Sequence, residues 1–137
     1  MADYLLDTNH VSPLVVAAHP LRRRVLSSLQ AGDTFSISVP TLTELLFGIS
    51  LLPRAKSNLA EWENLKTRFN YYSIDRSDAE QASAVQIALR RRGRQLATVD
   101  ALIAAVALRY DLILLTTDSD FDAIPDLKQA NWLTPRV

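Results

Sequence analysis

The chain of 137 residues carries fifteen basic and fifteen acidic side chains, so its formal net charge is zero. This balance argues against a protein that binds nucleic acid by bulk electrostatic attraction, although local basic patches stay possible. Because there is no cysteine, disulfides and thiolate metal sites are excluded. The length and an ordinary content of hydrophobic and charged residues predict one globular domain, residues 1–137.

No targeting or membrane segment is expected. The N-terminus lacks the basic start of a signal peptide, and Asp7 interrupts its first apolar run. The longest apolar stretch, Ala101–Leu108, is far shorter than the ~18 residues that a membrane span needs. We therefore expect a cytoplasmic protein with no membrane partner.

Short apolar runs alternate with helical patterns along the chain. Strands alternating with helices imply βαβ units and a mostly parallel sheet with helices on both faces, which is an α/β fold. In chain order the pattern predicts a strand at Tyr4–Asp7, a helix at Leu21–Gln30, a strand at Phe35–Val39, helices at Thr41–Leu52 and Ser57–Phe69, a strand at Tyr71–Ile74, helices at Ser77–Arg92 and Val99–Tyr110, a strand at Leu112–Thr116 and a weak fifth strand near Asn131–Leu133.

Four carboxylates fall where predicted elements begin or end. Asp7 closes the first strand, Asp118 follows the Leu112–Thr116 strand, and Glu44 and Asp100 lie near the heads of apolar helices. The ligand crevice of a parallel sheet lies beyond the carboxyl ends of its strands, so all four acids can converge there. Such a cluster repels itself unless it is protonated or binds cations. Oxygen ligands suit Mg²⁺ or Mn²⁺, so the pattern indicates a metal-dependent enzyme acting on phosphodiesters.

Each acid also has a structural alternative. Thr41–Glu44 fits the capping box S/T-x-x-E, and Ser77–Glu80 fits a second box. Asp100 could complement a helix dipole, and Asp118 could cap a turn. Asp7 fits these alternatives least, since a carboxylate after a central strand would be partly buried and needs a partner or a metal.

Four motifs stand out along the chain: LLDTN at Leu5–Asn9, TELLFG at Thr43–Gly48, VDALIAAVAL at Val99–Leu108 and LLTTDSDF at Leu114–Phe121. Together they resemble the PIN-domain ribonucleases, in particular the VapC toxins of bacterial and archaeal toxin–antitoxin pairs. The resemblance spans nearly the whole chain and implies a three-layer α/β/α PIN-like fold with a short, mostly parallel central sheet.

The resemblance also implies roles for the acids. It identifies four of them with the acidic quartet that holds Mg²⁺ or Mn²⁺ in the family, and it makes Asp120 an additional ligand or a supporting group. It implies that Asp7 and Asp118 are the firmest metal ligands and that Glu44 holds or deprotonates the attacking water. The quartet is Asp7, Glu44, Asp100 and Asp118.

Polar neighbours of the motifs have predicted supporting roles. Thr8, Asn9 and Thr116 resemble the family residues that orient carboxylates or metal-bound water. His10 lies beside the first motif and could touch the site, but a lone histidine is more often a surface or helix-start residue. We therefore expect His10 to lie at the surface or at the start of a helix.

Arg90, Arg91, Arg92 and Arg94 form the densest run of charge. Cations at a helix C-terminus offset the negative end of its dipole, which is one explanation for the run. The same residues could contact RNA phosphates near Asp100, which would make binding sensitive to salt. The shorter run at 22–24 is expected to be a solvated helix face.

The resemblance predicts an endoribonuclease toxin that cuts tRNA or rRNA and is restrained by a VapB-type antitoxin. In VapC relatives the helices that correspond to 41–69 form a groove for the antitoxin, which suits helix-in-groove binding. A homodimer is expected for the same reason. The alternative function is a PIN-like module that binds RNA or protein without catalysis.

Overall fold

The computed structural model describes residues 1–133, and residues 134–137 of the predicted domain lie outside the described part. Five strands form one sheet in the order β3-β2-β1-β4-β5, and every neighbouring pair is parallel. The prediction of a parallel α/β sheet is therefore confirmed. The strands are β1 (Asp3–Leu6), β2 (Thr34–Ser38), β3 (Asn70–Tyr72), β4 (Ile113–Leu115) and β5 (Gln129–Ala130).

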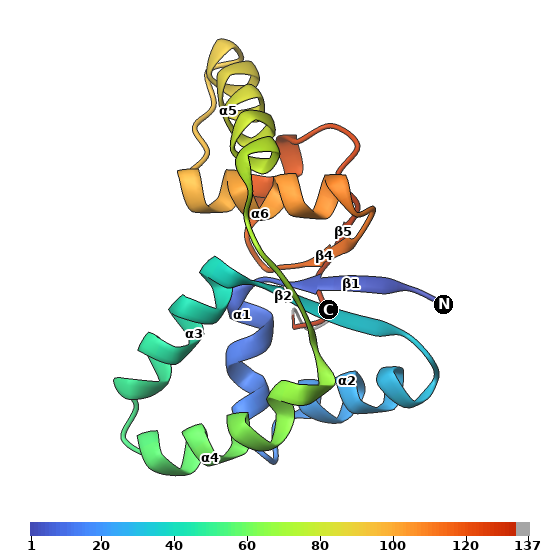
Figure 1. Cartoon of the computed structure of the whole chain (residues 1–137), viewed down its shortest axis with the longest axis vertical. Coiled ribbons are helices and arrows are strands. Elements are labelled where there is room, and N and C mark those ends of the chain that lie inside the picture. The colour runs from blue at the N-terminus through green and yellow to red at the C-terminus, as the bar shows by residue number, and fades with distance from the viewer. Residues whose placement is uncertain (134–137) are drawn as a thin grey trace.

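Helices cover both faces of this sheet, as Figure 1 shows, so the three-layer arrangement is also confirmed. Helices α5 and α6 pack on one face, and the helices from α1 to α4 pack on the other. The five longer helices lie within four residues of their predicted positions, whereas α1 was not predicted. The helices are α1 (Thr8–Val11), α2 (Pro20–Gln30), α3 (Val39–Ser50), α4 (Ala55–Leu65), α5 (Arg76–Arg91) and α6 (Thr98–Arg109), with short 3₁₀ turns η1 (Ser12–Val15), η2 (Lys66–Arg68) and η3 (Ser119–Ala123).

The alternation of side chains along the central strands divides the core into two parts. Leu5 and Leu114 are paired across β1 and β4 and point into the core under α5 and α6. Leu6 and Leu115, one residue further along each strand, point into the core under α1, α2, α3 and α4. Because successive residues of a strand face opposite sides, this register fixes which residues are available at the strand ends.

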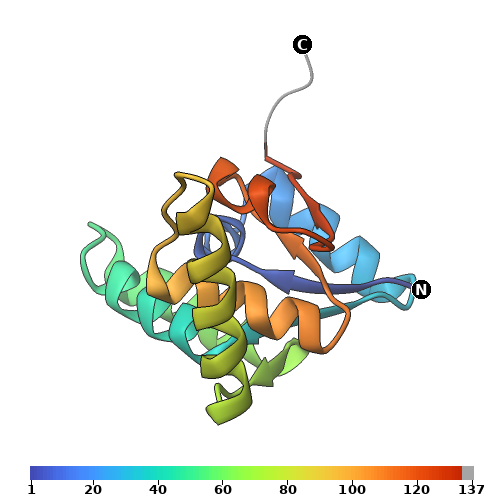
Figure 2. The same cartoon turned by 90° about the horizontal axis from the view of Figure 1, so that it is seen from above.

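The paired ends of β1 and β4 place two of the predicted acids at one edge. The Asp7 N–H donates to the Leu115 carbonyl oxygen at 3.0 Å, which extends the pairing by one residue. Asp118 follows three residues after Leu115 at the same edge. Helices α3 and α6 also begin on this side of the molecule, as Figures 1 and 2 show from two directions.

Helix α3 begins earlier than predicted, so the proposed capping box at Thr41–Glu44 is wrong. The helix starts at Val39 with Ser38 as its N-cap and Pro40 in the first turn. Proline fits this position because its missing N–H has no partner inside the helix. Thr41 is therefore buried within the helix and accepts a hydrogen bond from the Ser38 hydroxyl at 3.1 Å.

The capping box of α5 is real but lies two residues before the predicted Ser77–Glu80 box. Asp75 is the N-cap: its carboxylate accepts from the Asp78 N–H at 3.1 Å, and the Asp78 carboxylate accepts from the Asp75 N–H at 3.0 Å. Arg109 of α6 then donates to both carboxylates, at 2.7 and 3.3 Å. The actual cap thus joins the start of α5 to the end of α6.

The fifth strand lies at Gln129–Ala130, so the predicted position near Asn131–Leu133 is wrong by two residues. Trp132 instead packs on the face of the sheet, with its ring centroid 5.0 Å from that of Tyr4 and 5.8 Å from that of Phe35. The Arg24 guanidinium lies 3.8 Å from the Trp132 ring centroid, an attractive cation–π contact.

The arginines of α2 are more engaged than the predicted solvated face. Arg22 forms an ion pair with Glu61 at 2.8 Å, and its side chain is only 16% exposed. Arg24 stacks on Trp132, whereas Arg23 is exposed as predicted. Among residues 1–133, no helix is long and apolar enough to cross a membrane.

Phe35 and Phe47 offer a matched test of this packing. Phe35 is 1% exposed between Tyr4 and Trp132, whereas Phe47 on α3 is 67% exposed. We predict that Phe35→Ala lowers the free energy of unfolding by about 3–5 kcal/mol because it leaves a cavity. Phe47→Ala should change it by less than about 0.5 kcal/mol. Urea denaturation measures both, and equal losses in the two variants would contradict this core.

Candidate active site

Three carboxylates meet at the carboxyl edge of the sheet. Asp118 follows β4, Asp120 lies in the η3 turn, and Asp100 lies in the first turn of α6. One oxygen atom from each lies within 4.8 Å of the other two. The structure therefore brings Asp120, predicted only as an additional or supporting group, into the closest set of acids.

Backbone hydrogen bonds shape the turn that carries two of these acids. The Asp118 side chain caps η3 by accepting from the Asp120 N–H at 2.9 Å, so the predicted capping role of Asp118 is confirmed. The Asp118 N–H in turn donates to the Thr116 hydroxyl oxygen at 3.0 Å. The third acid, Asp100, lies where the N-terminus of α6 favours negative charge.

Electrostatic coupling extends this set to Asp7 and Glu44. Burial raises the pKa of Asp100 from 3.8 to about 6, and the charges of Asp7, Asp118, Glu44 and Asp120 add to the effect. Burial and the Asp7 charge likewise raise the pKa of Glu44 above its usual range. The charges of Asp7, Glu44, Asp118 and Asp120 are thus all close enough to act on Asp100, although Asp7 and Glu44 are outside the closest set.

The Asp7 carboxylate is buried, at 7% exposure, and is held by donors on both oxygens. Its Oδ1 accepts from the Thr8 N–H at 2.9 Å, while Oδ2 accepts from the Thr116 hydroxyl at 2.7 Å. The Asn9 amide nitrogen also donates to Oδ2 at 3.2 Å. The three polar residues predicted to orient the carboxylates therefore all contact Asp7, although Thr8 does so through its backbone.

His10 is buried with no exposed surface and lies in the last turn of the short helix α1, so the prediction of a surface or helix-start residue is wrong. Its Nδ1 lies 2.7 Å from the Asn9 Oδ1, and its Nε2 accepts from the Trp132 N–H at 3.0 Å. Burial and, to a lesser degree, the charge of Arg24 lower the pKa of His10 from 6.5 to about 4. Helix α1 has only four residues, which is too short for a helical repeat of apolar residues to show. The sequence therefore did not indicate that His10 is buried.

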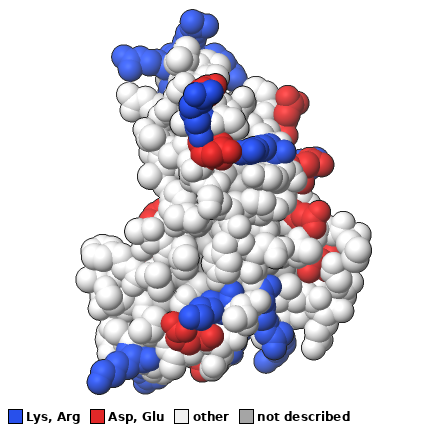
Figure 3. Space-filling model, viewed as in Figure 1, with Lys and Arg blue, Asp and Glu red and all other residues white. Residues whose placement is uncertain are grey.

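The predicted basic run lies at the C-terminal end of α5, where Lys and Arg side chains gather in Figure 3. Arg90, Arg91 and Arg94 are exposed, and Arg92 donates to the Ala123 carbonyl oxygen at 3.3 Å. Arg94 and Asp120 line the same hollow of about 160 Å³. The structure thus places one end of the basic run directly beside the acids.

The donor set suits a divalent cation. All ligand atoms in the closest set are carboxylate oxygens, which Mg²⁺ and Mn²⁺ favour. Among residues 1–133, no arginine or lysine forms an ion pair with Asp100, Asp118 or Asp120. Burial and repulsion therefore act on Asp100 with no ion pair among the described residues to offset them, and a bound metal ion would relieve the repulsion.

The fold and site together define a small α/β protein with an acidic centre at the carboxyl edge of a parallel sheet. The family model for the PIN domain matches residues 4–127. The chain therefore belongs to the PIN-domain family, as its motifs predicted.

Curated relatives and a solved structure agree with this assignment. The tRNA(fMet)-specific endonuclease VapC of Shigella flexneri is 28% identical, over 96% of this chain and 99% of that protein. Ribonuclease VapC4 of Mycobacterium tuberculosis is 31% identical, over 72% of this chain and 77% of that protein. The matching chain in the structure of DNA-bound VapBC from Salmonella typhimurium has a TM-score of 0.79 at 25% identity, over 96% of this chain and 99% of that chain. The predicted similarity to VapC proteins is confirmed.

Asp100→Asn tests the repulsion in protein stripped of divalent ions. At neutral pH we expect the variant to melt roughly 3–5 °C higher than wild type, because it removes a charge that its neighbours oppose. Between about pH 4 and 6 the folded wild type holds a proton on Asp100 that the unfolded chain has lost. The contribution of Asp100 to the free energy of unfolding therefore falls as pH rises through this window. His10 acts with the opposite sign over the same range in both proteins, so the Asp100 contribution is taken from the difference between wild type and variant.

Differential scanning calorimetry in EDTA at about pH 4.5 and 7.5 checks both statements, since the advantage of the variant should shrink at the lower pH. Asp122→Asn, an exposed acid of the same turn, is the matched control. The same gain in the control, or a gain that does not depend on pH, would contradict the repulsion at Asp100.

Proposed function

We propose that this protein is a divalent-metal-dependent endoribonuclease that acts as the toxin of a toxin–antitoxin pair in the cytoplasm. The observation that carries the proposal is the set of carboxylate oxygens from Asp100, Asp118 and Asp120 within 4.8 Å of one another. The set lies at the carboxyl edge of the sheet in a chain of the PIN-domain family, and curated relatives are named as ribonucleases.

In this proposal Asp100, Asp118 and Asp120 hold Mg²⁺ or Mn²⁺, while Asp7 and Glu44 add negative charge around it. When bound, the ion polarises the phosphate and stabilises the charge that develops on the leaving oxygen. In this assignment Asp120 is a metal ligand and not only a supporting group. The Asp7 carboxylate is held in place by Thr8, Asn9 and Thr116.

Glu44 is the proposed acceptor of the proton that the attacking water loses. Burial and Asp7 raise its pKa above that of an ordinary glutamate. A general base works best when its pKa approaches the working pH, so this shift favours the role. Glu44 lies on α3, and its side chain is accessible to solvent.

The basic run is the proposed contact for the RNA backbone. Arg90, Arg91 and Arg94 are exposed, and Arg94 shares a hollow with Asp120. A strand whose phosphates follow these side chains would be led toward the acids. The Arg92 guanidinium already donates a hydrogen bond to the Ala123 carbonyl oxygen, so we expect Arg92 to contribute less to RNA binding than the other three arginines.

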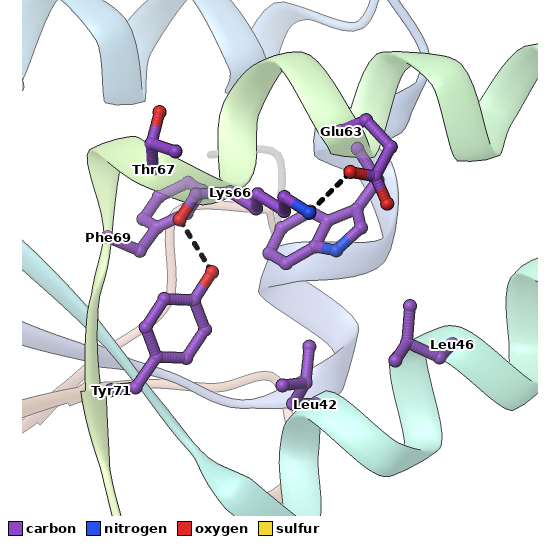
Figure 4. Close-up of a pocket in the computed structure, with 8 residues that line it drawn as sticks. Leu42, Leu46, Glu63, Lys66, Thr67, Phe69 and Tyr71 are labelled. Atoms are coloured by element: carbon purple, nitrogen blue, oxygen red, sulfur yellow. Dashed lines mark hydrogen bonds and ion pairs between the residues drawn. The ribbon is translucent and has the colours of Figure 1, made fainter.

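The antitoxin is proposed to cover an apolar groove between α3 and α4. Figure 4 shows Leu42 and Leu46 of α3 on one side of this groove, facing the segment that carries Phe69 and Tyr71. Polar contacts link residues on the other side of the groove. The Tyr71 hydroxyl donates to the Lys66 carbonyl oxygen at 2.6 Å, and the Lys66 ammonium group forms an ion pair with the Glu63 carboxylate. The groove has a volume of about 450 Å³.

Further apolar side chains are exposed on and next to the helices that line this groove. Phe47 and Leu51 of the α3 region are 67% and 69% exposed, and Leu59 of α4 is 43% exposed. Exposed patches of this kind mark interaction sites, and an amphipathic helix of a VapB-type antitoxin is the proposed occupant. The matched Salmonella structure is itself a VapBC assembly. A homodimer stays a prediction from the family resemblance.

Cleavage of pooled cellular RNA tests the proposed activity. We expect discrete products with Mg²⁺ or Mn²⁺ and none with EDTA. Asp100→Asn should lower the rate roughly a hundredfold or more, because it removes one of the charges that hold the ion. Asp122→Asn is the matched control and should cut like wild type. Antitoxin-free wild type that binds RNA but never cuts it would favour a non-catalytic binding module.

The basic run is tested by the salt dependence of RNA binding, measured with inactive Asp100→Asn protein. Replacing Arg90, Arg91 and Arg94 together by alanine should flatten the slope of log K against log[salt] by about 0.7 for each phosphate that these side chains no longer neutralise, hence by about 2. An unchanged slope would exclude the run from the RNA path. The matched control removes the same charge from exposed arginines elsewhere, Arg23, Arg54 and Arg76.

A further inference from the structure

A buried histidine beside the acidic centre has a contact on each ring nitrogen. His10 has no exposed surface, and its two partners come from opposite ends of the chain. Nδ1 lies 2.7 Å from the side-chain oxygen of Asn9, and Nε2 lies 3.0 Å from the backbone nitrogen of Trp132. Neither contact belongs to the set of carboxylates, so the role of this histidine needs its own explanation.

The Trp132 contact determines which nitrogen of His10 carries the proton. A backbone N–H can only donate, so Nε2 must accept with its lone pair. In a neutral imidazole the other nitrogen then carries the hydrogen. His10 is therefore the Nδ1–H tautomer, and Nδ1–H donates to the Asn9 Oδ1.

The tautomer of His10 and the Thr117 N–H together fix the orientation of the Asn9 amide. The Asn9 Oδ1 accepts from His10 and also from the Thr117 N–H at 3.2 Å. The amide nitrogen must then point the other way, toward the Asp7 Oδ2 at 3.2 Å and the Thr116 hydroxyl at 3.4 Å. A flipped amide would place donors against both the His10 Nδ1–H and the Thr117 N–H.

We propose that His10 is a positioning residue for Asp7: its Nδ1–H tautomer, set by the Trp132 N–H, holds Asn9 so that its amide donates to the Asp7 carboxylate. The proposal rests on the proposed function, because Asp7 matters for catalysis only if the acidic centre binds metal. The donors run in one direction, from Trp132 through His10 and Asn9 to Asp7. The Asp7 Oδ2 thereby has a second donor beside the Thr116 hydroxyl.

Packing far from the acids holds the first donor of this chain in place. The Trp132 ring lies against Tyr4 and Phe35, and Arg24 covers it. The segment after β5 thus supports the active site through one backbone N–H, 122 residues away from His10 in the sequence. A partner group of this kind fixes a carboxylate of the acidic centre although it never touches the metal.

The tautomer is measurable in the wild-type protein by nitrogen-15 NMR of the imidazole rings. His19 is an internal control, because its Nδ1 accepts from the Leu21 N–H at 3.1 Å and its neutral ring should be the Nε2–H tautomer. These are the only two histidines, and His19→Asn, which keeps a capping side chain, assigns the signals. We expect Nδ1–H for His10 and Nε2–H for His19 at about pH 8, where an ordinary imidazole is neutral. An Nε2–H ring at His10 would overturn the proposal.

Two substitutions then test whether the contact with Asn9 acts on the site. His10→Leu removes both ring nitrogens, whereas His10→Asn can place an amide N–H where Nδ1–H was. We expect His10→Leu to weaken Mn²⁺ binding in calorimetry and to lower kcat, each by roughly tenfold, with KM for RNA unchanged. His10→Asn should recover most of both losses.

The outcomes separate this inference from the proposed function. A wild type that neither binds Mn²⁺ nor cuts RNA would overturn both. An active, metal-binding wild type that His10→Leu matches in Mn²⁺ affinity and kcat would overturn the positioning role alone. So would a loss that His10→Asn fails to reverse, because it would follow from the missing ring and not from the N–H at Asn9. If His10→Leu does not fold, the NMR tautomer and His10→Asn still decide the proposal.

Discussion

Repulsion between carboxylates at the carboxyl edge of the sheet is the constraint on which the site depends. The pairing of β1 with β4 brings Asp7 and the turn around Asp118 to the same edge, and the start of α6 adds Asp100. Burial and the neighbouring charges together raise the pKa of Asp100 to about 6, so the neighbouring acids oppose the ionisation of Asp100. A protein can keep such an arrangement only if packing elsewhere outweighs the repulsion, and a cation that relieves it is bound strongly for the same reason.

Hydrogen bonds within the protein hold two of these acids, Asp7 and Asp118, in place without the help of a metal. Asp7 has donors from Thr8, Asn9 and Thr116, while Asp118 caps the η3 turn and is itself held through Thr116. Two cores, one on each face of the sheet, hold the strands that carry these groups. These contacts fix the positions of Asp7 and Asp118, which would reduce the reorganisation needed to bind an ion.

Local patterns predicted the strands, the longer helices and the acids, because strand ends in a parallel sheet meet at one edge. The predictions that were wrong or incomplete concern features that depend on contacts between residues far apart in the sequence, or on competing local signals. The predicted capping box at Thr41–Glu44 does not form, because helix α3 begins earlier, at Val39, with Pro40 in its first turn. His10 is hydrogen-bonded to Trp132, which packs on Tyr4 and Phe35. These contacts join residues far apart in the sequence, so no short stretch of the sequence indicates that His10 is buried. Asp120 joined the closest acids only because the η3 turn folds back on Asp118.

An anomalous difference map from crystals of the protein soaked in Mn²⁺ tests directly whether the acidic centre binds metal. We expect a peak within about 2.0–2.4 Å of an oxygen from each of Asp100, Asp118 and Asp120, with no comparable peak in crystals of Asp100→Asn. A map without a peak at these carboxylates, or one whose only peak lies on the exposed acids elsewhere, would contradict a metal centre at the edge of the sheet.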